Sequence, residues 1–116
     1  MNFTNDTPAI VISRTAQTLE TVWHQVLLGI EEEGIPWCWQ QDDDGDAIQR
    51  AWQAATRSPL LVGLAGSADE VVVHFRNLPP TNPLFRQAWA QDEDQLRRLG
   101  NNAARLVKGL PFKLSP

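Results

Sequence analysis

The sequence PAIVIS at Pro8–Ser13 begins the segment that decides the fold. This run is too apolar for either side of it to face water, which is typical of a strand buried between layers of helices. From Leu19 onward, apolar residues recur at three- and four-residue spacing, which predicts an amphipathic helix capped by Thr18 or a neighbour and ended by Gly34. A short second strand is expected at WCWQ, Trp37–Gln40. These elements form a βαβ unit, so the sequence predicts an α/β fold.

The middle of the chain repeats the alternation of helix and strand. An acidic turn, Asp42–Asp46, precedes residues 47–55, in which apolar side chains have helical spacing. A third buried strand is expected at Leu60–Ala65 and a fourth at Glu70–Phe75. The turn between them is too short for a parallel crossover, so we expect these two strands to be antiparallel.

The last third contains one stiff loop and one helix. Three prolines fall within Asn77–Pro83, and a short edge strand is expected at Phe85–Ala90. Asp92, with a glutamine three residues later, is similar to a capping box and opens a final helix that Pro111 ends. We therefore expect one domain, residues 1–116, with about three helices and a mixed sheet of four or five strands.

Composition excludes several classes of function. The net charge of the 116 residues is −4, and the ten Lys and Arg residues are scattered, which argues against nucleic-acid binding. No apolar run approaches the roughly 20 residues that span a membrane. Residues 1–7 are polar and show no secretory signal. The single cysteine, Cys38, forms no internal disulfide and fits a reducing cytoplasm. Of the five tryptophans, we expect most in the core and one or two facing a partner.

No segment has the pattern of a catalytic, nucleotide or metal site. Gly63–Gly66 is glycine-rich but contains no lysine and leads towards a strand, unlike a phosphate loop. The acidic turn lacks the spacing of a calcium loop, and His24, His74 and Cys38 are not spaced as zinc ligands. We therefore expect the chain alone to be non-catalytic and to bind no cofactor. One alternative stays open, a small α/β phosphocarrier that uses Cys38 or a histidine as its phosphoryl acceptor.

Three consecutive glutamates, Glu31, Glu32 and Glu33, close the first predicted helix. Their charges face the negative end of the helix dipole, so local helix stability does not explain them. Two interpretations remain: a solvated acidic helix end, or an acidic patch that meets a cation or basic residues of a partner.

Four blocks, in this order and at consistent spacing, carry a resemblance to a known family. They are VLLGIEEEGIP at 26–36, SPLLVG at 58–63, NLPP at 77–80 with PLF at 83–85, and LGNNAARLVKGLPF at 99–112. Together they resemble the small subunit of the diol dehydratase and glycerol dehydratase reactivating factors, and the propanediol-utilisation version most closely. The match covers nearly the whole chain. The departures, residues 37–39 and 42–46, fall between the shared blocks.

The resemblance implies a chaperone-like role in an ATP-dependent factor. In that family a large partner subunit binds ATP and hydrolyses it to ADP, and the factor is expected to be an α2β2 heterotetramer. The small subunit resembles the β subunit of the dehydratase. It would leave its large partner, bind the dehydratase large subunit in place of the β subunit, and so release damaged cobalamin. The implied fold is a three-layer α/β/α domain with a mixed sheet, similar to the anticodon-binding-like fold.

The resemblance also implies a site. Glu31 matches a glutamate that shares a divalent cation, magnesium or calcium, with the large subunit. The expected partner-binding residues are Glu31, Glu32, Glu33, Asn77, Leu78 and Pro79. The client, a diol or a glycerol dehydratase, and the location, free in the cytoplasm or inside a bacterial microcompartment, stay open. A structural subunit of the dehydratase itself is a further alternative.

Overall fold

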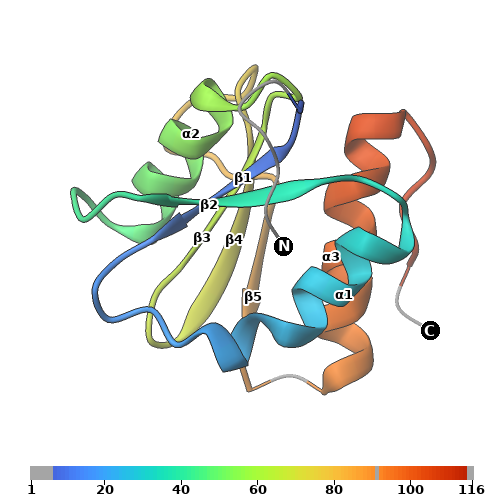
Figure 1. Cartoon of the computed structure of the whole chain (residues 1–116), viewed down its shortest axis with the longest axis horizontal. Coiled ribbons are helices and arrows are strands. Elements are labelled where there is room, and N and C mark those ends of the chain that lie inside the picture. Colours follow the sequence, from blue (N-terminus) through green and yellow to red (C-terminus); the bar gives the residue numbers. More distant parts are fainter. Residues whose placement is uncertain (1–6, 91, 115–116) are drawn as a thin grey trace.

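The computed structural model describes residues 7–90 and 92–114, so the polar segment 1–6 lies outside the described residues. Five strands form one mixed sheet in the order β2-β1-β3-β4-β5. Helix α2 covers one face of the sheet, and α1 and α3 cover the other (Figure 1). The predicted three-layer α/β/α domain is therefore confirmed, with the five-strand count. The strands are Ile10–Arg14 (β1), Trp37–Gln41 (β2), Val62–Gly66 (β3), Glu70–Phe75 (β4) and Phe85–Ala88 (β5), and the α-helices are His24–Glu32 (α1), Ala47–Arg57 (α2) and Glu93–Lys108 (α3).

The sheet is parallel on one side and antiparallel on the other. Strand β1 pairs in parallel with both β2 and β3, as the predicted βαβ unit requires. Strands β3 and β4 are antiparallel, which confirms the hairpin, and β5 extends the antiparallel half as an edge strand. One edge of the sheet thus carries the carboxyl ends of β1, β2 and β3. The opposite edge carries their amino ends and the loop that follows β4.

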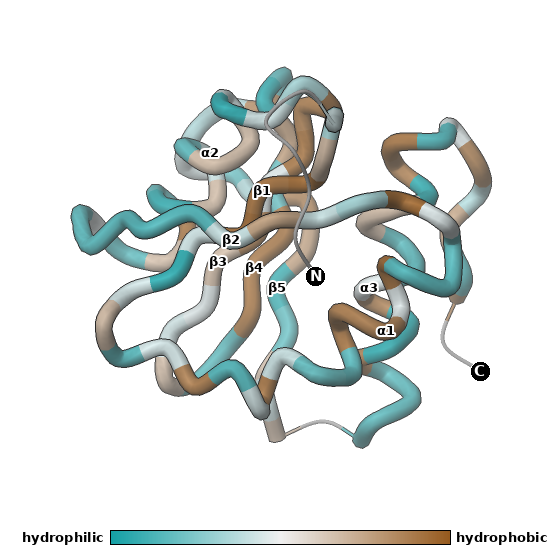
Figure 2. Tube along the Cα trace, in the orientation of Figure 1, coloured by the Kyte–Doolittle hydropathy of each residue, from teal (hydrophilic) through white to brown (hydrophobic). Residues whose placement is uncertain are grey.

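The core divides into a large and a small half because the buried residues of α2 are alanines, apart from Arg50. Side chains of β1, β3 and β4 pack against α1 and α3 in the large half, which contains Ile10, Ile12, Leu64, Val71 and Val73. On the other face, Ala65 and Val72 pack against Ala47 and Ala51 of α2. The hydrophobic colour in Figure 2 accordingly concentrates in the middle of the sheet. Trp23 and Trp37 are buried, whereas the other three tryptophans are half-buried, close to the expected division.

The first helix differs from its prediction in how it begins. Residues Glu20–Trp23 form a 3₁₀-helix, η1, which continues into α1. Its N-cap is Leu19, and no side chain caps it. Thr18 Oγ1 instead accepts a hydrogen bond from the backbone N–H of Thr15, at 2.8 Å. Because a 3₁₀ turn has three residues instead of 3.6, the predicted apolar stripe is rotated at this end, and Leu19 and Val22 face solvent.

Two other elements begin or end at residues different from those predicted, and the backbone conformation at these positions explains both differences. Strand β3 begins at Val62, not Leu60, because Leu61 has a φ of 67° and its N–H closes a turn onto Ser58. The last helix ends at Gly109, whose φ of 69° is the left-handed conformation that favours glycine, and not at Pro111. The predicted cap at Asp92 is confirmed, since its side chain accepts the N–H of Gln95 at 2.8 Å. Asp46 caps α2 in the same way, as the acidic turn predicted.

Helices α1 and α3 approach each other through one glycine in each. A Cβ atom on Gly29 would overlap the carbonyl oxygen of Arg97, and one on Gly100 would overlap that of Val26. The Asn101 side-chain amide donates to the Gly29 carbonyl at 2.8 Å, so a buried polar residue joins the two backbones. This crossing holds the acidic end of α1 close to the last turns of α3.

Candidate partner-binding surface

The three predicted glutamates lie together at the end of α1, and two of them, Glu32 and Glu33, meet cations among the described residues. Glu33 Oε1 lies 2.9 Å from Lys108 Nζ, and Glu33 Oε2 lies 3.3 Å from Arg105 Nε. Glu32 accepts from the Asn101 amide at 3.2 Å and lies 4.0 Å from Arg97. All four partners come from α3. Cations of the same chain therefore compensate the charges of Glu32 and Glu33 at the negative end of the helix.

Glu33 is the structural member of the group. Its side chain is only 10% exposed, and Lys108 also donates to its backbone carbonyl at 2.9 Å. The hydrogen bond from Lys108, helped by Arg105 and opposed by burial, lowers the pKa of Glu33 below its ordinary value of 4.5. Glu33 therefore stays ionised and ties the end of α1 to α3.

Glu33→Gln is expected to lower the free energy of unfolding by about 0.5 to 1 kcal/mol at neutral pH, the scale of a partly exposed ion pair. Because the folded-state pKa is lowered, the contribution is present above the unfolded-state value and disappears as the pH falls through the folded-state value. Urea unfolding of both proteins between pH 7 and about 3.5 measures this difference. A difference that stays constant across that range would contradict the assignment.

Glu31 differs from its two neighbours because no cation of the described residues lies within ion-pair distance of it. It is exposed, and its side chain accepts a hydrogen bond from the Trp37 indole at 3.3 Å. That contact fixes the side chain at the start of β2 but does not neutralise it. Glu31 thus presents a held carboxylate that is open to a cation from outside the chain.

The second predicted segment, Asn77–Pro79, lies at the same edge of the sheet as the glutamates. It follows β4, and Asn77 and Pro79 are exposed while Leu78 is half-buried. His74, fully buried in β4, anchors this loop: Nδ1 lies 2.9 Å from the Phe75 N–H and so accepts, while Nε2 donates to the Pro80 carbonyl at 3.0 Å. His74 thus has a structural role in this loop. Both predicted segments lie on the side of the sheet that carries the amino ends of the parallel strands, and we call the two together the acidic-edge surface (residues 31–33 and 77–79).

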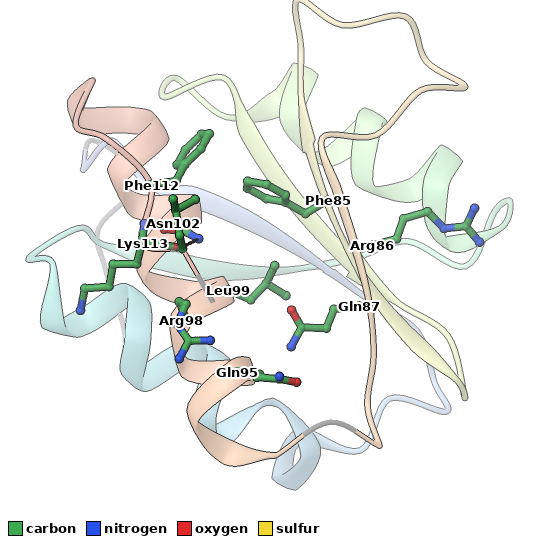
Figure 3. Close-up of a pocket in the computed structure, with 10 residues that line it drawn as sticks. Phe85, Arg86, Gln87, Gln95, Arg98, Leu99, Asn102, Phe112 and Lys113 are labelled. Carbon is green, nitrogen blue, oxygen red and sulfur yellow. Dashed lines mark hydrogen bonds between the residues drawn. The ribbon is translucent and has the colours of Figure 1, made fainter. Parts of the chain in front are cut away.

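A separate hollow of about 430 Å³ opens between β5 and α3. Phe85 and Phe112 meet edge to face across it, with ring centroids 5.1 Å apart, and Leu99 lies at its base (Figure 3). Gln87 points into this space from β5, while Arg86 points to the opposite side of the strand. The Gln87 side-chain nitrogen is buried and has no hydrogen-bond partner among the described residues. No pattern in the sequence indicates this hollow, because it forms between residues of β5, α3 and the segment that follows α3.

Neither a metal-binding group of side chains nor a phosphate loop lies in the part of the chain that the structure describes. It contains no group of three or more His, Cys, Asp or Glu residues that could hold a metal ion. Gly63–Gly66 lies within β3 and leads into the hairpin, so it is not a phosphate loop at a helix start. Among the same residues, no helix has the length and apolar character to cross a bilayer.

Cys38 lies in the middle of β2, half-buried, and burial raises the pKa of its thiol. Because the thiolate is the nucleophile, the thiol is expected to react with a disulfide reagent more slowly at pH 7.5 than a free cysteine does. The rate of absorbance change with an aromatic disulfide, with and without urea, measures this. A rate for the folded protein equal to or above the unfolded rate would favour the phosphocarrier alternative.

Comparison with known proteins identifies the family to which this chain belongs. Residues 7–113 match the family described as "Dehydratase medium subunit". The "Propanediol dehydratase-reactivating factor small subunit" of Citrobacter freundii is 55% identical over 92% of this chain and 91% of the relative. A structure described as diol dehydratase-reactivating factor complexed with ADP and Mg2+ superposes with a TM-score of 0.87 and 50% identity, covering 93% of this chain and 99% of that one.

The glycerol relative is more distant. A structure described as glycerol dehydratase reactivase superposes with a TM-score of 0.83 and 32% identity, over 92% of this chain and 97% of that one. The closer similarity to the propanediol type agrees with the four sequence blocks. This chain therefore belongs to the family of small subunits of diol and glycerol dehydratase-reactivating factors.

Proposed function

We propose that this chain is the exchanging subunit of an ATP-dependent reactivating factor. It pairs with a large ATPase subunit in an α2β2 assembly, dissociates from it, and binds the large subunit of an inactivated adenosylcobalamin-dependent dehydratase. Occupying the place of the dehydratase β subunit opens the cobalamin site, so damaged cofactor leaves. The reaction takes place in the cytoplasm or in a bacterial microcompartment.

One observation supports the exchange step above others. The family that matches residues 7–113 is described as the medium subunit of a dehydratase, whereas the relatives of highest identity reported above are subunits of a reactivating factor. A fold shared by a component of the client and a component of the chaperone is what competitive replacement requires. The direction of exchange then depends on which nucleotide the large partner holds, since only different affinities in two states shift a population.

The acidic-edge surface is the proposed contact with the large subunit. Glu31 is the proposed ligand of a shared magnesium or calcium ion, because its carboxylate is exposed, oriented by Trp37 and not paired with a cation of the described residues. Divalent cations of this kind take oxygen ligands. Glu32, Glu33 and residues 77–79 would then surround the metal contact.

Exchange can be followed directly with a fluorescent label on this chain. Native electrophoresis of labelled chain, unlabelled large subunit and inactivated dehydratase should show the label moving from the large subunit to the dehydratase, and leaving the dehydratase when ATP is added. The matched control uses ADP without ATP. Label that stays with the large subunit under all nucleotide conditions would contradict exchange.

The family description also supports a second candidate, a permanent structural subunit of the dehydratase. The two candidates differ in stoichiometry. A structural subunit would remain in active, purified dehydratase in equal amount with its other subunits. An exchanging subunit would be absent from active preparations and bound only to inactivated enzyme.

The isolated chain is expected not to bind ATP measurably, because Gly63–Gly66, its one glycine-rich candidate, is a strand instead of a phosphate loop. Titration calorimetry with ATP and magnesium checks this. A micromolar dissociation constant for the purified small chain would overturn the assignment of ATP to the large partner.

A further inference from the structure

The order of the first three strands creates a crevice at the carboxyl edge of the sheet. Strands β2, β1 and β3 are parallel and adjacent in that order, and the chain leaves β1 for the η1–α1 layer and β3 for the hairpin to β4. In open α/β sheets, ligands bind where connections from neighbouring strands diverge in this way. The loop after β1 and the turn after β3 run next to each other at this edge (Figure 1).

A pocket of about 330 Å³ fills this crevice. Thr15 and Thr18 line it from the loop after β1, Ser67 lines it from the turn after β3, and Arg50 lines it from α2. Its volume lies at the lower end of the range for ligand sites. We call it the switch-point pocket. It lies at the opposite edge of the sheet from the acidic-edge surface.

Arg50 supplies the charge of this pocket. The residue is 5% exposed, and its guanidinium donates to Ser13 Oγ at 3.3 Å, to the Gly45 carbonyl at 3.3 Å and to the Gly66 carbonyl. All three acceptors are neutral, and a guanidinium has five N–H donors. Among the described residues, no carboxylate lies within ion-pair distance of Arg50.

The nearest acidic groups act on Arg50 from outside the pocket. Burial lowers the pKa of Arg50, and Asp42, Asp46 and Asp43 of the acidic turn raise it by a smaller amount. None of the three lines the pocket, and no other acidic residue does so among the residues that the structure describes. Arg50 is also the one cation in that lining. The pocket therefore holds a buried positive charge that is incompletely compensated, a state that an anion would relieve.

The remaining walls are apolar. Trp23 and Trp89 meet edge to face with ring centroids 5.1 Å apart. At the rim, Leu19 is 67% exposed and Val22 is 40% exposed. Exposed large apolar side chains beside a polar cavity mark a surface that another group covers.

From this combination we infer that the switch-point pocket binds a carboxylate or phosphate group carried on an apolar or aromatic body. The oxyanion lies against Arg50 and the hydroxyls of Thr15, Thr18 and Ser67, while the body packs on the two indoles. Such a group has two possible sources, a free small molecule and an acidic side chain of a protein partner. The chemistry is the same in both cases.

The first test uses benzoate and its neutral counterpart benzamide as probes of the full chain. The indole N–H signals of Trp23 and Trp89 are followed by nuclear magnetic resonance, with that of Trp52, which does not line the pocket, as an internal reference. Benzoate is expected to shift the Trp23 and Trp89 signals saturably and to bind at least fivefold more tightly than benzamide. Equal affinities, or shifts that do not saturate, would overturn the inference.

Variants then test the role of charge at the pocket without disturbing its buried wall. Gln17 is exposed and lines the mouth, so Gln17→Lys should tighten benzoate binding and Gln17→Glu weaken it, each by about twofold to fivefold. Thr56 is exposed and lies near the C-terminal end of α2, away from Arg50 at the start of that helix. It provides the matched controls Thr56→Lys and Thr56→Glu. Equal effects at the two positions would contradict the site. Arg50→Gln, where it folds, should weaken benzoate binding at least tenfold.

A third arm distinguishes the two sources. Saturating large subunit is added to the complex of this chain with benzoate, and free benzoate is measured. Displacement of benzoate would identify the natural group as an acidic side chain of the partner, and retention would identify it as a small molecule. The benzoate titration uses this chain alone. A negative titration would therefore contradict the pocket and would say nothing about the proposed subunit exchange.

Discussion

Glu31→Gln is expected to weaken binding of the large subunit by about tenfold or more when magnesium or calcium is present, a typical cost of altering a metal site. The amide keeps the size of the carboxylate and can still accept from the Trp37 indole. It lacks the negative charge of the carboxylate, and the affinity of such a site for a divalent cation falls as the charge of its ligands falls. Glu31 is exposed and forms no ion pair with a cation of the described residues. The melting temperature of the Glu31→Gln chain should therefore equal that of the wild-type chain.

Calorimetry of the subunit interaction with divalent ion and with chelator measures this effect. Glu93→Gln is a matched control, since Glu93 is an exposed glutamate in the first turn of α3, at the opposite end of that helix from the glutamate cluster. It should bind like the wild-type chain in both conditions. Equal affinity of the Glu31→Gln and wild-type chains, with and without metal, would rule out a metal role and return Glu31 to a solvated helix end.

Gly100→Ala is expected to lower the free energy of unfolding by about 2 kcal/mol or more. The new Cβ would meet the Val26 carbonyl oxygen and lie 3.0 Å from the Ile30 nitrogen, both backbone atoms of α1 that cannot rotate away. Overpacking of this kind typically costs about 1 to 3 kcal/mol and occasionally more, and it outweighs the higher helix propensity of alanine, worth about 1 kcal/mol.

Urea unfolding of the variant measures this loss, with Gly34→Ala as the contrasting substitution. A Cβ on Gly34 would have no atom within 4 Å, but the φ of 77° disfavours alanine, so a loss of about 1 kcal/mol is expected from backbone strain alone. A Gly100→Ala chain as stable as the wild type would show that α1 and α3 do not cross at these glycines. The acidic end of α1 would then not be positioned by α3 as described.

Much of the fold could be predicted because its signals are local. Glu70–Phe75 contains three consecutive valines, and the structure places β4 at those bounds. Asp46 and Asp92 each precede a helical pattern, and each caps the helix that follows. The hairpin direction followed from the length of one turn. In each case the deciding interaction spans only a few residues.

The parts that sequence reasoning missed depend on contacts between distant segments. Arg50 belongs to a helix with several other polar residues, and its burial is set by Ser13 and Gly66 on two separate strands. Lys108 lies 75 residues from Glu33, so no spacing rule could pair them. The strand order likewise follows from how the helices pack, which a local pattern does not encode.

The three glutamates at the end of α1 show what could and what could not be predicted from the sequence. The sequence identified Glu31, Glu32 and Glu33 as anomalous from the helix dipole alone, and a family resemblance singled out Glu31. It could not separate their roles, because the separating observation is which of them α3 neutralises. The structure supports Glu31 as the glutamate that is available to a cation from outside the chain. The metal contact itself stays a prediction.

The central claim, that this chain works as the small subunit of an ATP-dependent reactivating factor, is tested most directly by recovery of enzyme activity. Dehydratase inactivated by its own turnover is incubated with this chain, its large partner, ATP, magnesium and intact adenosylcobalamin, and each component is omitted in turn. We predict that activity returns only in the complete mixture. Equal recovery without this chain, or recovery without ATP, would contradict the account.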